Sequence, residues 1–381
     1  MPNNPNLENY GLHDLSNLNF NAIKKSLKNK FITNDKICSE LERKISNLTN
    51  SKYTVVCNNG TSALMMCILA TNIKDVIAIV PNINFVGIAS IISLLKGKII
   101  FCDVNQNTGM VDKKSLESII KKCKKKKIKP NVFIPIHYAG KYLEMSQFKK
   151  ICKLEKIYLI EDGCHSFGTH LSPKKIVGDC KNSLCTTFSF HPVKNITTIE
   201  GGAITTNNKN FYKKILEIRN HSLKKTSIDD PYNLISPSLN FRMGEMNAAI
   251  GISQLRMINN FKSKRQMLVK YYIEKLSKFK DYFKILNDNS KGTFWHLFVI
   301  LLNSNKFKER KKLMNFLKKK NIATQIHYKP LSSHKCYKKY TLENENKNSE
   351  IFYKSQLTLP LHTRMKKKDI DNLVKAFDKF F

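Results

Sequence analysis

The segment Phe188–Lys194 reads Phe-Ser-Phe-His-Pro-Val-Lys, and a Gly-Gly turn follows it at 201–202. An apolar stretch therefore leads directly into a single lysine that is set close to a turn. Burial lowers the pKa of a lysine, as a nucleophile that forms a Schiff base requires. Taken alone, the segment favours a lysine that reaches solvent from the end of a strand.

A carboxylate pair, Glu161-Asp162, stands just after the apolar run 157–160, which we expect to be a strand. Ligands of open α/β sheets bind at the carboxyl ends of their strands, so an acid here is placed to pair with a protonated ring nitrogen. A helix cap or a surface acid is the alternative interpretation.

The turn Asn58–Ala63 follows another expected strand and opens an expected helix. Such a turn offers free backbone N–H groups and the positive end of a helix to a phosphate. Thr61 and Ser62 add hydroxyl groups, although either is also an ordinary helix N-cap.

The three stretches together match the needs of one cofactor. Pyridoxal phosphate requires a phosphate cup, an acid at its pyridine nitrogen and a lysine for its aldehyde. The sequence therefore predicts Thr61 and Ser62 at the phosphate, Asp162 at the ring and Lys194 as the covalent anchor.

The rest of the chain is arranged as an α/β protein. With 381 residues and 41% apolar content, it can form two domains. We expect a large cofactor-binding domain at 1–260, with a mostly parallel central sheet covered by helices, and a small C-terminal α+β domain at 261–381. Expected strands are 53–57, 76–81, 98–103, 131–136, 157–161, 184–190, 202–206, 293–302 and 322–327; expected helices are 61–70, 85–95, 113–122, 146–154, 208–220, 244–277, 307–320 and one from 367.

The charge and the cysteine content argue against two classes of function, nucleic-acid binding and metal binding. The net charge of +37 invites a nucleic-acid interpretation, but only seven of the 66 basic residues are arginine and the lysines are spread along the chain. The ten cysteines form no Cys-x-x-Cys pair, so we expect reduced cysteines and no metal site. We also expect no specific nucleic-acid partner, no membrane span and a cytoplasmic location.

The chain resembles the sugar aminotransferases of the DegT/DnrJ/EryC1/StrS group, within fold-type I of the pyridoxal-phosphate enzymes. The likeness covers nearly the whole chain, and its combination of motifs is specific. These motifs are 58–63, Pro81–Phe85, Pro135–Gly140, Glu161-Asp162, Phe188–Lys194, Glu200–Ala203, Arg219–His221, Asn240–Met243 and Gln325–Pro330.

The resemblance implies a role for each matching position. Thr61, Ser62 and Ser189 hold the cofactor phosphate, while Phe85 stacks on the ring. Asp162 pairs with the ring nitrogen, His165 lies beside the ring, and Lys194 forms the covalent link. Asn240 reaches the cofactor of a neighbouring subunit, which implies a homodimer with shared active sites, and His327 and Tyr328 contact the sugar nucleotide.

Within the family, the motifs 191–198, 251–255, 327–330 and 359–362 most resemble the aminotransferases of pseudaminic acid synthesis. This implies transfer of an amino group from L-glutamate to C4 of a UDP-linked 2-acetamido-2,6-dideoxy-4-keto hexose, for flagellin glycosylation or cell-surface polysaccharide. Alternatives are another nucleotide-linked 4-keto or 3-keto sugar (the UDP-bacillosamine, legionaminic acid or dTDP-sugar routes), a non-catalytic cofactor-binding regulator, and a basic nucleic-acid binder. The chain departs from the common pattern at Ile199, where many relatives have Gly, at Asn84 in place of a frequent Thr, and at Cys164 in place of Ala.

Overall fold

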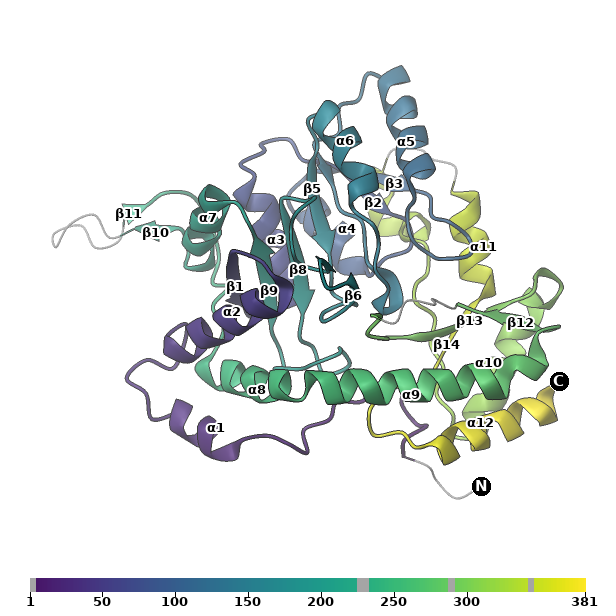
Figure 1. The fold of residues 1–381 in the computed structure, drawn as a ribbon. Helices are drawn as coiled ribbons and strands as arrows, with labels where there is room; N and C mark the ends of the chain where they lie inside the picture. The colour runs from purple at the N-terminus through teal and green to yellow at the C-terminus, as the bar shows by residue number, and fades with distance from the viewer. Residues whose placement is uncertain (1–4, 225–232, 287–291, 342–345) are drawn as a thin grey trace.

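A seven-stranded sheet forms the centre of the molecule in a computed structural model, which describes residues 5–224, 233–286, 292–341 and 346–381 (Figure 1). Its strand order is β1-β9-β8-β5-β4-β2-β3. β9 is antiparallel to both of its neighbours and the other pairs are parallel, which confirms a mostly parallel sheet. The strands are β1 (Tyr53–Cys57), β2 (Ile77–Pro81), β3 (Lys98–Cys102), β4 (Val132–Phe133), β5 (Tyr158–Asp162), β8 (Cys185–Ser189) and β9 (Gly202–Thr206).

Helices cover both faces of this sheet (Figure 1). Successive side chains of a strand point to opposite faces, and β2 shows the result: Ala78 and Val80 pack into one apolar cluster, and Ile79 packs into another. The run of buried apolar residues is therefore continuous rather than alternating. The helices are α2 (Lys36–Thr49), α3 (Gly60–Ala70), α4 (Val86–Leu94), α5 (Lys113–Lys125), α6 (Ser146–Leu154), α7 (Lys209–Arg219) and α8 (Glu245–Arg256).

A second apolar core lies beside the one that the central sheet forms with its helices. It joins one face of the long helix α9 to a three-stranded antiparallel sheet and the C-terminal helix. Because this core is formed almost entirely by residues after 260, we propose that 261–381 is a separate α+β domain. Its elements are α9 (Ile258–Leu276), β12 (Phe283–Ile285), β13 (Phe298–Leu302), α10 (Arg310–Lys319), α11 (Lys347–Ser355), β14 (Gln356–Leu359) and α12 (Lys367–Phe380).

Several details differ from the sequence-based expectation, and one is that the strand expected at 131–136 is only the two residues of β4. The helix expected at 244–277 is two helices, α8 and α9, separated at Met257, whose N–H turns back to the carbonyl of Gln254. The strand expected at 322–327 is absent, and Gln325 forms a single bridge with Thr358 of β14, an unforeseen strand. The strand expected at 293–302 begins at Phe298. The smaller elements are α1 (Phe20–Ser26), β6 (His170–Ser172), β7 (Lys175–Ile176), β10 (Leu223–Lys224) and β11 (Asn233–Leu234).

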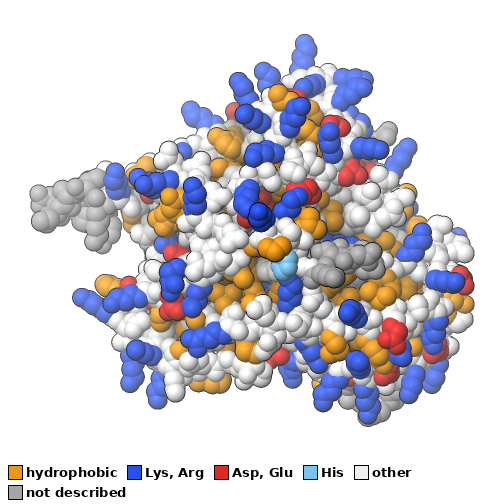
Figure 2. Space-filling model, in the orientation of Figure 1, with side chains coloured by type: hydrophobic (Ala, Val, Ile, Leu, Met, Phe, Trp, Pro, Cys, Tyr) orange, Lys and Arg blue, Asp and Glu red, His pale blue; other side chains and the backbone are white. Residues whose placement is uncertain are grey.

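Lysine and arginine side chains are scattered over the face shown in Figure 2, with apolar and acidic side chains among them. This distribution suits a charged surface in water better than a continuous basic stripe. Among the residues that the structure describes, no helix has both the length and the hydrophobicity that a membrane crossing requires. Across the same residues, no group of His, Cys, Asp or Glu side chains is arranged to hold a metal ion.

Candidate active site

A cavity of about 680 Å³ lies at the carboxyl ends of β5 and β8. The side chains predicted from the sequence converge on it from distant parts of the chain, with one exception. Asn240 is exposed and does not line the cavity. The predicted residues that do line it are Thr61, Ser62, Phe85, Asp162, His165, Ser189, Lys194, His327 and Tyr328.

The first turn of α3 forms one end of the cavity. The side chain of Asn59 caps the helix by accepting a hydrogen bond from the N–H of Ser62 (2.8 Å). A Cβ on Gly60 would lie 2.7 Å from the Cβ of Ser189, so only glycine allows β8 to approach this closely. The hydroxyl groups of Thr61, Ser62 and Ser189 thereby surround a helix N-terminus, which is a favourable site for an anion.

Asp162 ends β5 with its carboxylate held at both oxygens. Oδ1 accepts a hydrogen bond from the backbone N–H of Cys164 (3.1 Å), and Oδ2 accepts one from Nδ2 of Asn84 (3.3 Å). Phe85, which follows Asn84, lines the same cavity, yet this residue is 55% exposed. An exposed aromatic face next to a fixed carboxylate suits a flat, nitrogen-containing ring.

Lys194 lies in the loop after β8, on the same cavity as Asp162. Its N–H donates to the carbonyl of His191 (2.9 Å), which fixes the turn that presents the side chain. Burial lowers the pKa of Lys194, and the nearby Cys164 and Asp162 offset part of this effect. The lowered pKa favours the neutral amine, which is the nucleophilic form.

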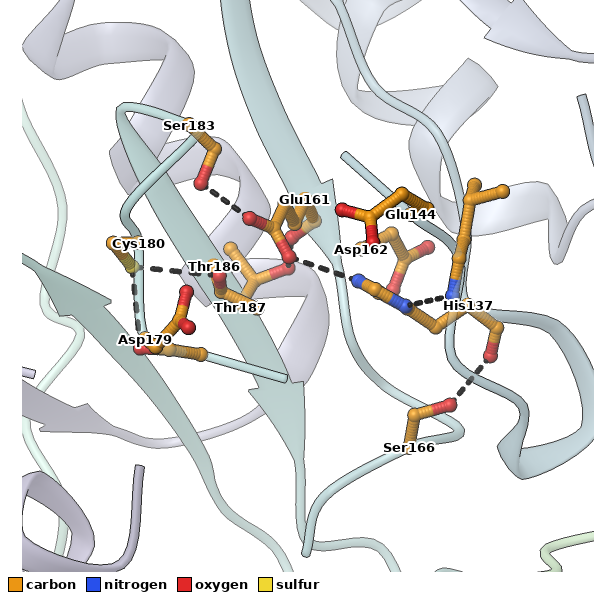
Figure 3. A network of polar contacts seen from close by, with 12 residues as sticks. His137, Glu144, Glu161, Asp162, Ser166, Asp179, Cys180, Ser183, Thr186 and Thr187 are labelled. Carbon is orange, nitrogen blue, oxygen red and sulfur yellow. Dashed lines mark hydrogen bonds and ion pairs between the residues drawn. The ribbon is translucent and has the colours of Figure 1, made fainter. Parts of the chain in front are cut away.

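A buried polar network lies behind Asp162 (Figure 3). Nε2 of His137 is 2.8 Å from Oε2 of Glu161, and the hydroxyl of Ser183 donates to the other carboxylate oxygen. The backbone N–H of Leu143 donates to Nδ1 of His137 (3.0 Å), so the neutral ring carries its hydrogen on Nε2 and donates to Glu161. The N–H of His137 also donates to the carbonyl of Asp162 (3.0 Å), which links the network to the site.

Two buried histidines, His165 and His327, line another part of the cavity with Tyr328, and a third buried histidine, His296, contacts His165. Nε2 of His165 is 2.8 Å from the hydroxyl of Tyr328, and the ring centroids of His165 and His296 are 4.6 Å apart. Burial, together with the charge of Lys194, lowers the pKa values of His165, His296 and His327, so all three rings are neutral near pH 7.

Sequence reasoning missed several residues of the site, Tyr10 and Asn84 among them. Tyr10 lies in the N-terminal segment. The carbonyl of Tyr10 accepts a hydrogen bond from the backbone N–H of Leu361 (2.9 Å), and this bond holds the segment in place. No local pattern marks such a tertiary contact. The sequence does mark Asn84 as a departure from a frequent Thr next to Phe85, but it does not reveal the hydrogen bond of this residue to Asp162.

Comparisons with known proteins show what the whole chain is similar to. A Campylobacter jejuni (strain 81-176) protein named UDP-4-amino-4,6-dideoxy-N-acetyl-beta-L-altrosamine transaminase is 30% identical over 360 residues, covering 94% of both chains. A Helicobacter pylori protein of the same name is 29% identical over 94% of this chain and 95% of its own. The solved structure of Helicobacter pylori PseC, an aminotransferase involved in the biosynthesis of pseudoaminic acid, superimposes with a TM-score of 0.89 at 27% identity over 98% of both chains.

A sugar aminotransferase structure from Streptococcus pneumoniae, at 23% identity and a TM-score of 0.87, shares the fold. The sequence profile of one family matches residues 13–378, almost the whole chain. This protein is therefore a member of the DegT/DnrJ/EryC1/StrS aminotransferase family.

Proposed function

We propose that this chain is a pyridoxal-phosphate-dependent transaminase that moves an amino group from L-glutamate to C4 of a UDP-linked 2-acetamido-2,6-dideoxy-4-keto hexose. The observation that carries the proposal is that Lys194 and Asp162 line one cavity, with the first turn of α3 at its end. The names of the C. jejuni and H. pylori relatives support this sugar and a place in pseudaminic acid synthesis. A cytoplasmic location suits such nucleotide-linked substrates.

The residues present fit the cofactor. The start of α3 with Thr61, Ser62 and Ser189 would hold its phosphate, Phe85 would cover its ring, and Lys194 would hold its aldehyde carbon. When bound, pyridoxal phosphate supplies a carbonyl that carries the amino group and a ring that takes up electrons.

The carboxylate of Asp162 would keep a proton on the ring nitrogen. One hydrogen bond to a charged group contributes about 1.5–3 kcal/mol, or roughly one to two pKa units. Lys194, released when the donor amine enters, would take the proton from the α-carbon of the donor at Nζ and would deliver it to the carbon of the cofactor that had carried the aldehyde. The neutral form favoured by its lowered pKa suits this base role.

The experiment tests Lys194 in its two proposed roles, as the residue that holds the cofactor and as the base. Purified protein should show a visible absorbance band that glutamate bleaches, and Lys194→Ala should lose both the band and turnover. Lys209→Ala, an exposed lysine at the start of α7, is the matched control and should keep both. Normal turnover by Lys194→Ala with glutamate and keto sugar would overturn the proposal. Incubation with a panel of UDP- and dTDP-linked 4-keto sugars, followed by mass spectrometry, identifies the acceptor.

A homodimer with shared sites completes the proposal. Asn240 is exposed beside the phosphate cup, where its carbonyl accepts a hydrogen bond from Nδ2 of Asn58 (3.5 Å). Apolar side chains near it are also exposed, which is typical of a surface that binds a partner. They include Leu239 and Met246, which lie on the same segment as Asn240.

The partner subunit would bring its own Asn240 to the phosphate of this subunit. Lys194→Ala and Asn240→Asp chains should each be inactive alone but should regain activity when mixed and refolded together. In such a mixed dimer, one site contains both wild-type residues. No recovery from a mixture that does form dimers would contradict shared sites.

A further inference from the structure

The hydrogen bond between His165 and Tyr328 has a fixed direction. The backbone N–H of Ala139 donates to Nδ1 of His165 (3.4 Å), so this nitrogen is an acceptor. Burial, followed by the charge of Lys194, lowers the pKa of His165, so the ring is neutral and carries one hydrogen. That hydrogen is therefore on Nε2, which donates to the phenolic oxygen of Tyr328 at 2.8 Å.

The phenolic hydrogen of Tyr328 must consequently point to another acceptor. Burial raises the pKa of Tyr328, so the hydroxyl keeps its hydrogen at neutral pH. Within the part of the chain that the structure describes, His165 is the one hydrogen-bond partner of this hydroxyl. Since Tyr328 lines the cavity, a substrate that fills this space can supply the missing acceptor.

The ring of Tyr328 is also held in place. Its backbone carbonyl accepts a hydrogen bond from Nε2 of Gln356 (3.0 Å), and its ring meets Phe85 edge to face at 5.9 Å. The hydroxyl of Tyr138 donates to the carbonyl of the preceding residue, His327. Because the backbone and the ring of Tyr328 are both held, its hydroxyl group loses little conformational entropy when a substrate binds.

We propose that Tyr328 is a catalytic residue that donates its phenolic hydrogen bond to the ketone oxygen of the sugar acceptor, with His165 as the residue that orients it. This rests on the proposed function. The oxygen of a ketone gains negative charge as an amine attacks its carbon, and a preorganised donor stabilises that charge.

The two histidines next to Tyr328 favour a ketone over a carboxylate of the amino donor as the partner of its hydroxyl. His165 and His327, which face this region, are both neutral because burial lowers their pKa values. Neutral groups compensate poorly for the desolvation of a carboxylate, whereas an uncharged ketone costs much less to bury. The pair is therefore suited to the acceptor half of the reaction.

The experiment separates the two halves of the reaction by stopped-flow absorbance. Glutamate alone bleaches the visible band, and the keto sugar, added to the aminated protein, restores it. Tyr328→Phe should slow the restoration on the order of 100-fold while changing the bleaching rate, the position of the band and the affinity for the cofactor very little. Tyr272→Phe, whose hydroxyl donates to the carbonyl of Pro360 in the second core, is the matched control and should leave both rates unchanged.

The role of His165 is tested by the ratio of the two rates. His165→Leu removes the donor to Tyr328 and should lower the ratio of restoration to bleaching, whereas His165→Gln, which keeps an N–H donor, should recover most of it. The double variant His165→Leu/Tyr328→Phe should be no slower than Tyr328→Phe alone, because the two residues act as one unit. Equal slowing of both half-reactions by Tyr328→Phe, or an unchanged ratio in His165→Leu, would overturn the inference. A wild-type protein that glutamate does not bleach would instead overturn the proposed function.

Discussion

Nδ2 of Asn84 lies 3.3 Å from Oδ2 of Asp162 and donates a hydrogen bond to it. The other end of the same amide, Oδ1, accepts a hydrogen bond from the backbone N–H of Phe85 (2.6 Å). One buried side chain therefore ties the carboxylate proposed for the ring nitrogen to the residue proposed to cover the ring. The departure from Thr at this position leaves the site with a donor to Asp162.

Replacing Asn84 with Ala should weaken cofactor binding. Asp162 loses one of the two donors that orient it, and a hydrogen bond to a charged group contributes about 1.5–3 kcal/mol, so affinity should fall roughly tenfold to a hundredfold. Titration of the apoprotein with pyridoxal phosphate, followed by fluorescence, measures the change. Asn82→Ala is the matched control, because that buried amide accepts from the N–H of Ser332 (2.9 Å) and does not line the cavity. Equal losses in both variants would show a general loss of structure instead.

Breaking the buried pair of His137 and Glu161 should destabilise the fold. Removal of His137 leaves a buried carboxylate with the Ser183 hydroxyl as its remaining side-chain donor, so His137→Ala should lower the free energy of unfolding by about 3–5 kcal/mol. Urea unfolding measures this. Lys124→Ala, which breaks a surface pair with Glu155, should cost far less because water screens the charges. Similar losses in the two variants would contradict a special role for the buried pair.

The parts of the site that the sequence could reveal are those formed by neighbours along the chain. The turn at 58–63, the acids at 161–162 and the lysine after 188–193 each join a strand end to a polar group, and parallel strands bring their carboxyl ends together. The fold class follows from the same alternation of apolar strands and helices.

The parts that the sequence could not reveal depend on tertiary contacts. Tyr10 enters the cavity because Leu361, in the turn after β14, holds the N-terminal segment, and the network joins Glu161 of β5 to His137 of the loop after β4. The break between α8 and α9 at Met257 has no Pro or Gly to mark it. These features depend on packing that no local pattern encodes.

Ile199 adopts a backbone conformation that suits glycine. Its φ is 71°, in the left-handed region, where a β-branched side chain costs roughly 1–2 kcal/mol. Ile199→Gly should therefore raise the free energy of unfolding by about 1 kcal/mol, less than the full strain because glycine loses more entropy on folding. The midpoint of urea unfolding, at fixed protein concentration, measures it. Ile351→Gly, in helix α11, should have the opposite sign. A loss of stability in both variants would mean that contacts of Ile199 outweigh its strain.

His327 should make the protein sensitive to acid. Burial, and after it the charge of Lys194, lowers the pKa of His327 from 6.5 to about 3. Between these two values the unfolded chain binds a proton at this position and the folded chain does not, so the folded state loses stability as pH falls from 6.5 towards 3. The loss attributable to His327 should approach about 1.4 kcal/mol per pH unit.

His327→Gln removes this titration. The free energy of unfolding of wild type minus that of His327→Gln should therefore decrease as pH falls from 6.5 to 4.5, whichever of the two is more stable at pH 7 once the lost hydrogen bond to Thr358 is included. Urea unfolding at half-unit steps of pH measures the difference. Parallel curves for the two proteins would mean that His327 takes up its proton without unfolding the chain, because water or a rearranged Thr358 reaches the ring in the folded state.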